Sequence, residues 1–474
     1  MYKKFITSNL QFIIGVVFLL YYIYTLFVAI KIDSYLLTTF LLIIVLYIQS
    51  IGEFIYFYKK NGKPRLQDWF RVMIFINVVL DFMKVVNNSN NMYFKFYFHT
   101  LNLTDSFYAF IIVFITYIML DIAYVVGNSF FKKQKLNCKY AIKYRYLLLL
   151  LLFLTSLIKI YLLIAGISGY GSDIKYTTGF ASLIKNIFSA LNPFALIMSA
   201  YIVYIKKVKD IFFKKFFYVV FLLQVILGLL SGMKEEVILP ILFVGIVYLI
   251  GGYKISKKVL LIGIFLLILL YPLNNAYRNV INNPYKNTRS HFLNLIIAIE
   301  NLKNNPLEEI FNTSISSYSN RTSMYSFYQY SIKIESEWQY YKYMTRYFVL
   351  PIVWVIPRVI WENKPRSDIG AVFYEKIVGY KGQNSVTPTT LGWAYLEGGV
   401  IFVAIIFFIF GLILEFFDKK NIENPLYLLI YIFLLYKLMK PEWDVYFLLA
   451  KLIQSIILYW FLLKMFKIRK VCYD

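Results

Sequence analysis

The sequence contains very few residues of the kinds that form disulfides or metal clusters. Its 474 residues include two cysteines and two histidines. Cys138 and Cys472 do not form a CxxC pair, and both fall in stretches expected to be cytoplasmic. The sequence therefore indicates neither a disulfide nor a cysteine metal site, and His99 and His291 do not form a cluster in sequence.

Motifs that bind nucleotides or build common hydrolase sites are also absent. There is no GxGxxG, GxxxxGK[ST], HExxH or GxSxG motif. There is also no Asp-x-Asp pair of the kind that holds a nucleotide sugar through a metal ion. These absences argue against an enzyme driven by ATP or a nucleotide sugar, and we expect neither a cofactor nor a metal.

Acidic residues are scarce, and charge of either sign is limited. The chain has 25 Asp and Glu against 50 Lys and Arg, but only 16% of residues are charged and 60% are hydrophobic. The cations lie in short stretches between apolar segments, where they orient helices, so we expect no nucleic-acid partner. The composition predicts an all-α polytopic membrane protein.

Long apolar runs recur at the length that a membrane helix needs. A hydrocarbon core of about 30 Å requires about 20 apolar residues, which predicts about 12 transmembrane helices. They lie near residues 11–30, 35–57, 69–86, 106–127, 146–165, 183–205, 214–231, 235–252, 258–272, 392–415, 426–440 and 444–465. The first run lacks a convincing small-residue cleavage site, so we interpret it as an uncleaved anchor.

Lysine and arginine alternate between loops and so predict the orientation. Alternate loops together hold 26 cations, whereas the intervening short loops hold one or two each. The positive-inside rule places both termini in the cytoplasm. We therefore expect N-terminal transmembrane helices over residues 1–273, a large extracytoplasmic loop over 274–391, and C-terminal transmembrane helices over 392–474, all in the cytoplasmic membrane.

The predicted loop is richer in arginine, relative to lysine, than the rest of the chain. It holds six of the ten arginines but only seven of the 40 lysines. The planar guanidinium grips phosphate or carboxylate through two parallel hydrogen bonds, so the loop is expected to bind anions. Residues 291–305 and 323–344 are expected to form helices that lie over the membrane.

Few charged residues lie well inside the predicted spans. We expect Asp81 to pair with Lys84 one turn away, and isolated lysines such as Lys159 and Lys437 to extend toward the helix ends. A proton-coupled transport pathway would use more buried acids than these spans contain.

Four stretches in the second half, taken in order, carry a family resemblance. They are "LSGMKEEVILPILFVGIVYLI" (230–250), "SNRTSM" in the long loop, "IPRVIWENKP", and "SVTPTTLGWAYLEGGVIF" (385–402). In this order they resemble the bacterial O-antigen and capsule repeat-unit polymerases of the Wzy type. Where the family pattern has an acid soon after the glycine of "LGWAYLEGG", this chain has Trp393, and its acid is Glu397.

The resemblance implies a membrane glycosyltransferase with a GT-C-like fold. Such an enzyme transfers the growing glycan en bloc from undecaprenyl diphosphate to a newly exported, lipid-linked repeat unit. No nucleotide or metal takes part. The implied partners are undecaprenyl-diphosphate-linked oligosaccharides, membrane lipids, a chain-length co-polymerase and a flippase.

A site for this reaction must neutralise a departing diphosphate, hold two glycans and accept the acceptor's proton. The candidate catalytic residues are Arg278, Arg321, Arg358, His291 and Glu397. The candidate diphosphate or glycan contacts are Lys234, Lys364, Arg366 and Trp361. Aromatic residues such as Trp338 are candidates for stacking on sugars.

Each candidate also has a structural interpretation. Arginines anchor helix ends, and Lys234 has Glu235 and Glu236 beside it for local pairing. Arg366 has Asp368 two residues away, and tryptophans anchor loops at the membrane interface. Two other functions stay open, namely an O-antigen ligase, which shares the helix count and the outer loop, and an oligosaccharide flippase, which needs no dominant loop.

The orientation predicts a simple labelling pattern. A Ser316→Cys variant is expected to react with a membrane-impermeant thiol reagent in whole cells, because residue 316 lies in the predicted outer loop. Native Cys138 is expected to stay unlabelled until the membrane is opened. Equal labelling of both positions in intact cells would contradict the orientation.

Overall fold

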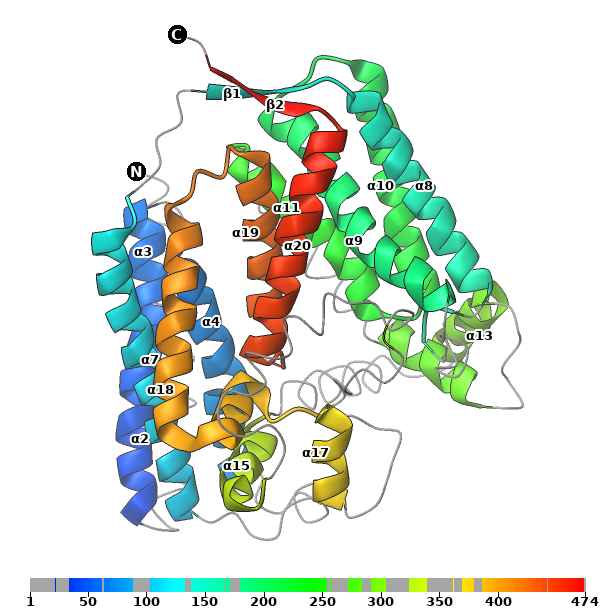
Figure 1. Ribbon diagram of the computed structural model, residues 1–474. Helices are drawn as coiled ribbons and strands as arrows, with labels where there is room; N and C mark the ends of the chain where they lie inside the picture. Colours follow the sequence, from blue (N-terminus) through cyan, green and yellow to red (C-terminus); the bar gives the residue numbers. More distant parts are fainter. Residues whose placement is uncertain are drawn as a thin grey trace. The chain divides into compact units, whose positions relative to one another are not determined.

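The computed structural model of the chain is almost entirely helical (Figure 1). It describes residues 22, 34–61, 64–87, 103–132, 138–165, 167–170, 180–253, 256, 272–283, 291–303, 324–338, 361, 369–378, 386–440 and 442–472. Within these residues the strands are β1 (Cys138–Ile142) and β2 (Ile468–Cys472), which pair antiparallel. The predicted all-α class is confirmed for this part of the chain, apart from that small ribbon.

The chain forms two compact units, each assembled from separate stretches of sequence. The first combines Met1–Lys135, Thr322–Asn421 and Phe433–Gln454, and the second combines Leu136–Arg321, Ile422–Ile432 and Ser455–Asp474. The predicted division into residues 1–273, 274–391 and 392–474 follows membrane topology instead of compactness, and it stays a prediction.

The first unit is built around two long helices, α7 (Leu103–Phe130) and α18 (Thr389–Lys419), which run side by side (Figure 1). Small residues allow their close approach, because a Cβ on Gly411 would lie 2.6 Å from the Cβ of Ala123. Around them lie α2 (Ser34–Tyr47), η1 (Ile48–Gly52), α3 (Glu53–Asn61), α4 (Leu66–Ile74), η2 (Phe75–Val79), α5 (Leu80–Asn87), α15 (Tyr325–Lys333), η5 (Glu335–Glu337) and α17 (Ile369–Val378).

The second unit is a helix bundle tied together by buried amides. Gln224 of α10 (Ile211–Leu230) donates to Ser156 Oγ of α8 (Arg145–Ile164) at 2.9 Å and to Asn192 Oδ1 of α9 (Phe180–Ala200) at 2.7 Å. In an apolar environment such hydrogen bonds hold helices together. The unit also contains η4 (Tyr201–Ile205), α11 (Lys234–Ile250), a helix over 272–282 and α13 (His291–Lys303).

The last two helices contribute residues to both units. They are α19 (Pro425–Leu438) and α20 (Val445–Met465). In the second unit the ring of Tyr459 stacks on Phe194 with centroids 6.0 Å apart, and the Tyr201 hydroxyl donates to the carbonyl of Glu423 at 2.9 Å. The C-terminal segment is therefore part of the fold of that unit.

Seven of the described helices are long and apolar enough to cross a membrane, as in a multi-pass membrane protein. They are Thr38–Lys60, Ser106–Phe130, Arg145–Ile164, Phe188–Ile205, Ile211–Leu230, Thr389–Lys419 and Val445–Met465. Ile401, Ile405 and Ile409 are exposed at every fourth position of α18, which gives this helix an apolar stripe suited to lipid.

These seven helices coincide with seven of the predicted spans, and the other five have different outcomes. The spans near 235–252 and 426–440 form α11 and α19, which are 17 and 14 residues long. The span near 69–86 is helical but broken into α4, η2 and α5 and carries several charges. The spans near 11–30 and 258–272 lie almost wholly outside the described residues.

Asp81, the acid of α5 that was expected to pair locally, holds the start of a helix distant in sequence. Asp81 Oδ2 accepts a hydrogen bond from the backbone N–H of Tyr325 at 3.0 Å, at the start of α15. The Tyr328 hydroxyl donates to the carbonyl of Ala109 at 2.9 Å, which fixes α15 against α7. The segment predicted as one surface helix over 323–344 therefore begins as a short helix packed into the first unit. The side chain of Lys84 lies outside the described residues.

A second charged group in the first unit is a fully buried arginine. The guanidinium of Arg71 donates to Glu53 Oε2 at 2.8 Å and to Asp121 Oδ1 at 2.5 Å. It also donates to the carbonyl of Tyr117 at 3.0 Å, so one side chain joins α3, α4 and α7. Asp121 is thus one member of an ion-pair network.

Loss of Arg71 is expected to destabilise the first unit strongly. Arg71→Met removes the buried cation shared by Glu53 and Asp121. Glu53 keeps its pair with Arg65 and both carboxylates are partly exposed, so we expect the lower end of the cost of about 3–5 kcal/mol for breaking a buried ion pair. Arg145→Met is the matched control, because Arg145 pairs with Asp210 at a partly exposed site and its loss should cost about 0–1 kcal/mol. Thermal unfolding in detergent measures both, and equal unfolding temperatures for the two variants would contradict the role assigned to Arg71.

Candidate functional site

The link between α10 and α11 in the second unit is a tight turn that only glycine fits. Gly232 has φ +64°, and a Cβ there would lie 2.3 Å from the ring of Tyr277. Asn274 Nδ2 donates to the Gly232 carbonyl at 2.5 Å, and the Tyr277 hydroxyl donates to the Leu230 carbonyl at 3.2 Å. These two hydrogen bonds hold the helix over 272–282 against the turn. We call the turn between α10 and α11, together with the residues that contact it, the turn site.

Lys234 is the first residue of α11 and belongs to the turn site. Its side chain is buried, and its Nζ lies 3.4 Å from Asn275 Oδ1. A buried ammonium at the start of a helix lies where the helix dipole adds positive potential. The turn therefore carries a buried positive charge at the start of α11. In the sequence a single lysine indicated this position.

Arg278 lies beside Tyr170, which is hydrogen-bonded to the same turn. Its guanidinium lies 4.3 Å from the ring centroid of Tyr170, and the backbone N–H of Tyr170 donates to the Ser231 carbonyl at 2.8 Å. Asn282 Nδ2 donates to the Tyr170 hydroxyl at 3.1 Å. Asn274, Arg278 and Asn282 recur every fourth residue and so share one helix face. The structure thus brings two predicted site residues, Lys234 and Arg278, to one turn.

Two further charged residues at this turn were not singled out as site residues. Lys159 of α8 is almost fully buried, and its Nζ lies 3.1 Å from Glu236 Oε2 in the first turn of α11. The expectation that Lys159 simply extends to the helix end is wrong, because an ion pair holds it inside the unit. The sequence signal was the acidic pair that opens an apolar helix in "MKEEVIL".

The turn site also contains a tyrosine that stays neutral. Burial raises the pKa of Tyr277 to about 12, so its hydroxyl remains a hydrogen-bond donor at physiological pH. Tyr277 is itself buried against Gly232, so the groups that the site offers are the cations Lys234 and Arg278, the ring of Tyr170 and the asparagine amides. Such a set suits a ligand that is both anionic and rich in hydroxyl groups.

A second unusual place is the start of α18 in the first unit. Thr389 is a buried, β-branched residue with φ +75°, and the helix is broken at Gly398 and Gly399, where the backbone is not helical. The nine residues from Thr389 to Glu397 form a separate, wholly buried helical segment. Strain of this kind in a buried threonine is often found at functional sites.

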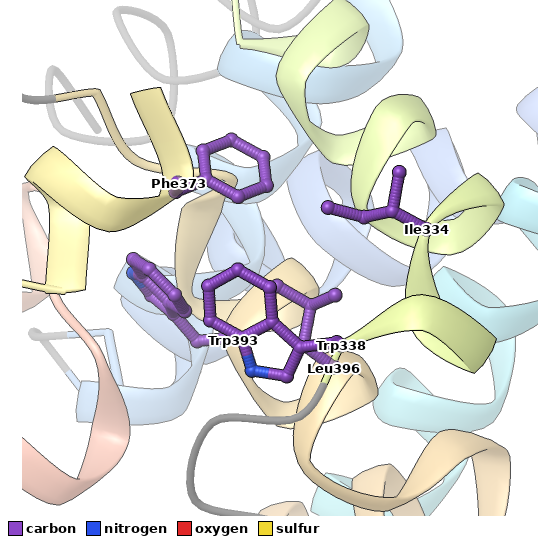
Figure 2. Packing of buried hydrophobic residues seen from close by; sticks show 5 residues of the cluster. All are labelled: Ile334, Trp338, Phe373, Trp393 and Leu396. Carbon is purple, nitrogen blue, oxygen red and sulfur yellow. The ribbon is translucent and has the colours of Figure 1, made fainter. Parts of the chain in front are cut away.

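The candidate Glu397 lies on this segment, as does Trp393, the residue at which the chain departs from the family pattern. Figure 2 shows Trp393 packed with Trp338, Phe373, Ile334 and Leu396 in one apolar cluster. The Trp393 indole N–H donates to Thr387 Oγ1 at 3.0 Å. Glu397 is buried and is the last residue before the glycine break, so it precedes the long apolar part of α18.

The packing in Figure 2 shows that Trp338, a candidate for stacking on sugars, is a core residue. Trp338 is almost fully buried, and its ring contacts Phe373 and Trp393 with centroids 6.2 and 6.1 Å apart. It therefore builds the core of the first unit and does not present a free face to a sugar. Trp361 differs from it, with 38% of its surface exposed.

Several candidates cannot be placed. Arg321, Arg358, Lys364 and Arg366 lie outside the described residues, as does the side chain of His291, whose backbone begins α13. Their roles stay predictions. Within the described part of the chain, no three His, Cys, Asp or Glu side chains gather as metal ligands.

One comparison with known proteins identifies a family. A family model described as a domain of unknown function, DUF8712, matches residues 66–473, which is most of the chain. The chain belongs to this family. No curated protein and no solved structure matches the chain.

The DUF8712 match covers both units and includes Lys234, Arg278 and Glu397. It agrees with the multi-helical, membrane-like architecture described above. The finer resemblance to repeat-unit polymerases stays a prediction.

The geometry of the turn site predicts that Gly232 does not tolerate a side chain. Gly232→Ala is expected to lower the unfolding temperature, because the left-handed backbone costs about 1–3 kcal/mol and the new Cβ overlaps Tyr277. Gly245→Ala in α11 is the control, since a Cβ there meets nothing within 4 Å. An unchanged unfolding temperature for Gly232→Ala would mean that the turn is not held as described.

Proposed function

We propose that this DUF8712 protein is a membrane glycosyltransferase that polymerises undecaprenyl-diphosphate-linked repeat units. The observation that carries the proposal is the meeting of Lys234 and Arg278 at one turn, beside Tyr170, Tyr277 and the asparagines of the helix over 272–282. The predicted orientation places this turn at the outer membrane surface, which is the depth of a lipid diphosphate. The missing nucleotide motifs are consistent with a donor of this kind.

In the proposed reaction the acceptor's hydroxyl oxygen forms a bond to the anomeric carbon of the growing glycan. The bond between that carbon and the diphosphate oxygen breaks, and undecaprenyl diphosphate leaves with the electron pair. Lys234 and Arg278 stabilise the charge that develops on the departing diphosphate. The proton of the acceptor passes to a carboxylate or an imidazole.

Three residues are candidates for accepting that proton. Glu236 belongs to the turn site, where Lys159 Nζ lies 3.1 Å from its Oε2. Glu397 and His291 are the candidates from sequence. Glu397 lies in the buried segment of the first unit, so it would need its own route to the acceptor.

The rest of the proposal concerns the loop residues. Arg321, Arg358, Lys364 and Arg366 supply further contacts to diphosphate, and exposed Trp361 contacts a glycan or the membrane interface. The proposal places the protein in the cytoplasmic membrane with its site facing outward. A chain-length co-polymerase and a flippase are its proposed partners.

The proposal predicts that the protein is active without nucleotide or metal. It also predicts that the charge-conserving change Arg278→Lys lowers this activity. Purified protein in lipid is expected to elongate lipid-linked repeat units in the presence of a chelator. Arg278→Lys keeps the charge but loses the bidentate fork, and should lower the rate about 10- to 100-fold. Arg145→Lys, at a partly exposed ion pair near the start of α8, should leave the rate unchanged.

The rival functions give different products in a deletion strain. A single repeat unit on the final acceptor indicates a polymerase, whereas long chains stranded on undecaprenyl diphosphate indicate a ligase. Absence of any exported unit indicates a flippase. Wild-type elongation by both Arg278→Lys and Lys234→Gln would contradict a role for the turn site in the reaction.

A further inference from the structure

The two cysteines of the chain are brought directly opposite each other by the β-ribbon of the second unit. In the antiparallel ladder of β1 and β2, Cys138 is the register partner of Cys472. These are the only cysteines among 474 residues, and they lie far apart in sequence. A sequence-based argument from spacing has no means of pairing them.

The register places the two Cα atoms at a separation that a disulfide accepts. Directly opposite residues of an antiparallel ladder have Cα atoms about 4.5–5.5 Å apart. A disulfide needs about 4.4–6.8 Å between the same atoms. Opposite positions of a ladder also belong to the same face of the ribbon, so positions 138 and 472 share a face.

The sequence of the ribbon places several cations near the two cysteines. Its ten residues include Lys139, Arg469 and Lys470 and no acid. Lys470 is two residues from Cys472 and opposite Tyr140, so it occupies the same face as the cysteine pair. Neighbouring cations stabilise a thiolate, which is the species that attacks a disulfide.

We propose that Cys138 and Cys472 are the site of a reversible intramolecular disulfide. The thiolate of one cysteine attacks an oxidised disulfide such as glutathione disulfide and forms a mixed disulfide. The second thiolate then displaces the glutathione thiolate and forms the bond between the two cysteine sulfurs. The protein loses two protons and two electrons, and one glutathione disulfide becomes two glutathione molecules.

The bond would tie two membrane helices together at one end. β1 runs into α8 three residues later, and β2 follows α20, so the cross-link joins the start of α8 to the end of α20. The predicted orientation places the ribbon in the cytoplasm, where the glutathione pool keeps thiols reduced. The disulfide is then a response to oxidising conditions. This inference does not depend on the proposed glycosyltransferase activity.

Peptide mapping of the full chain in membranes tests the proposal. The reduced protein is treated with glutathione disulfide, remaining thiols are alkylated, and tryptic peptides are analysed by mass spectrometry. Residues 136–139 ("LNCK") are expected to be found linked to residues 471–474 ("VCYD") in the monomeric protein. Dithiothreitol should release both peptides.

A register-shifted variant supplies the control. In Val471→Cys with Cys472→Ser, the thiol moves opposite Lys139 and to the other face of the ribbon. Its link to Cys138 should form at least about tenfold less than the native link, because positions 138 and 471 belong to opposite faces of the ribbon. The variant keeps the same number of thiols, so general reactivity is unchanged.

Three results would overturn the proposal. The first is full alkylation of both native cysteines after oxidation. The second is equal linkage in the native chain and the register-shifted variant, which would show that chance collision joins the thiols. The third is linkage only between separate copies of the chain, seen as a covalent dimer.

Discussion

Every charged or polar group inside an apolar helix bundle must find its partner within the protein, and this constraint shapes both units. Hydrocarbon offers no hydrogen bonds, so an unpaired guanidinium there costs far more than at a soluble surface. Arg71 meets the constraint by binding Glu53, Asp121 and the carbonyl of Tyr117. Three helices of the first unit are therefore held in one arrangement.

In the second unit the polar groups inside the bundle are paired through hydrogen-bonded amides and one ion pair. Gln224, Asn192 and Ser156 satisfy one another in the middle of three helices. Lys159 and Glu236 form their pair closer to the turn site. Close helix contact makes these bonds possible, because a Cβ on Gly228 would lie 2.4 Å from the carbonyl oxygen of Glu236. The position of the turn site thus follows from how tightly α10 and α11 pack.

The same packing separates structural aromatic residues from candidate ligand contacts. Trp338 and Trp393 pack in the core of the first unit together with Phe373 (Figure 2). Tyr170 lies beside Arg278 of the turn site instead, whereas Tyr277 is buried and holds the turn through the Leu230 carbonyl. Sequence composition could not make this distinction, because aromatic residues are abundant throughout the chain.

The sequence by itself determined the all-α class of the described residues and seven candidate membrane spans, and it selected Lys234 and Arg278 as candidate site residues. Apolar runs of bilayer length and the uneven use of lysine and arginine are local properties, and they can be counted along the chain. The tertiary structure alone decided that Lys159 pairs with Glu236, that Asp81 holds Tyr325, and that Cys138 lies opposite Cys472. These pairs join residues far apart in sequence, and no local pattern encodes which distant partner will satisfy a group once it is removed from water.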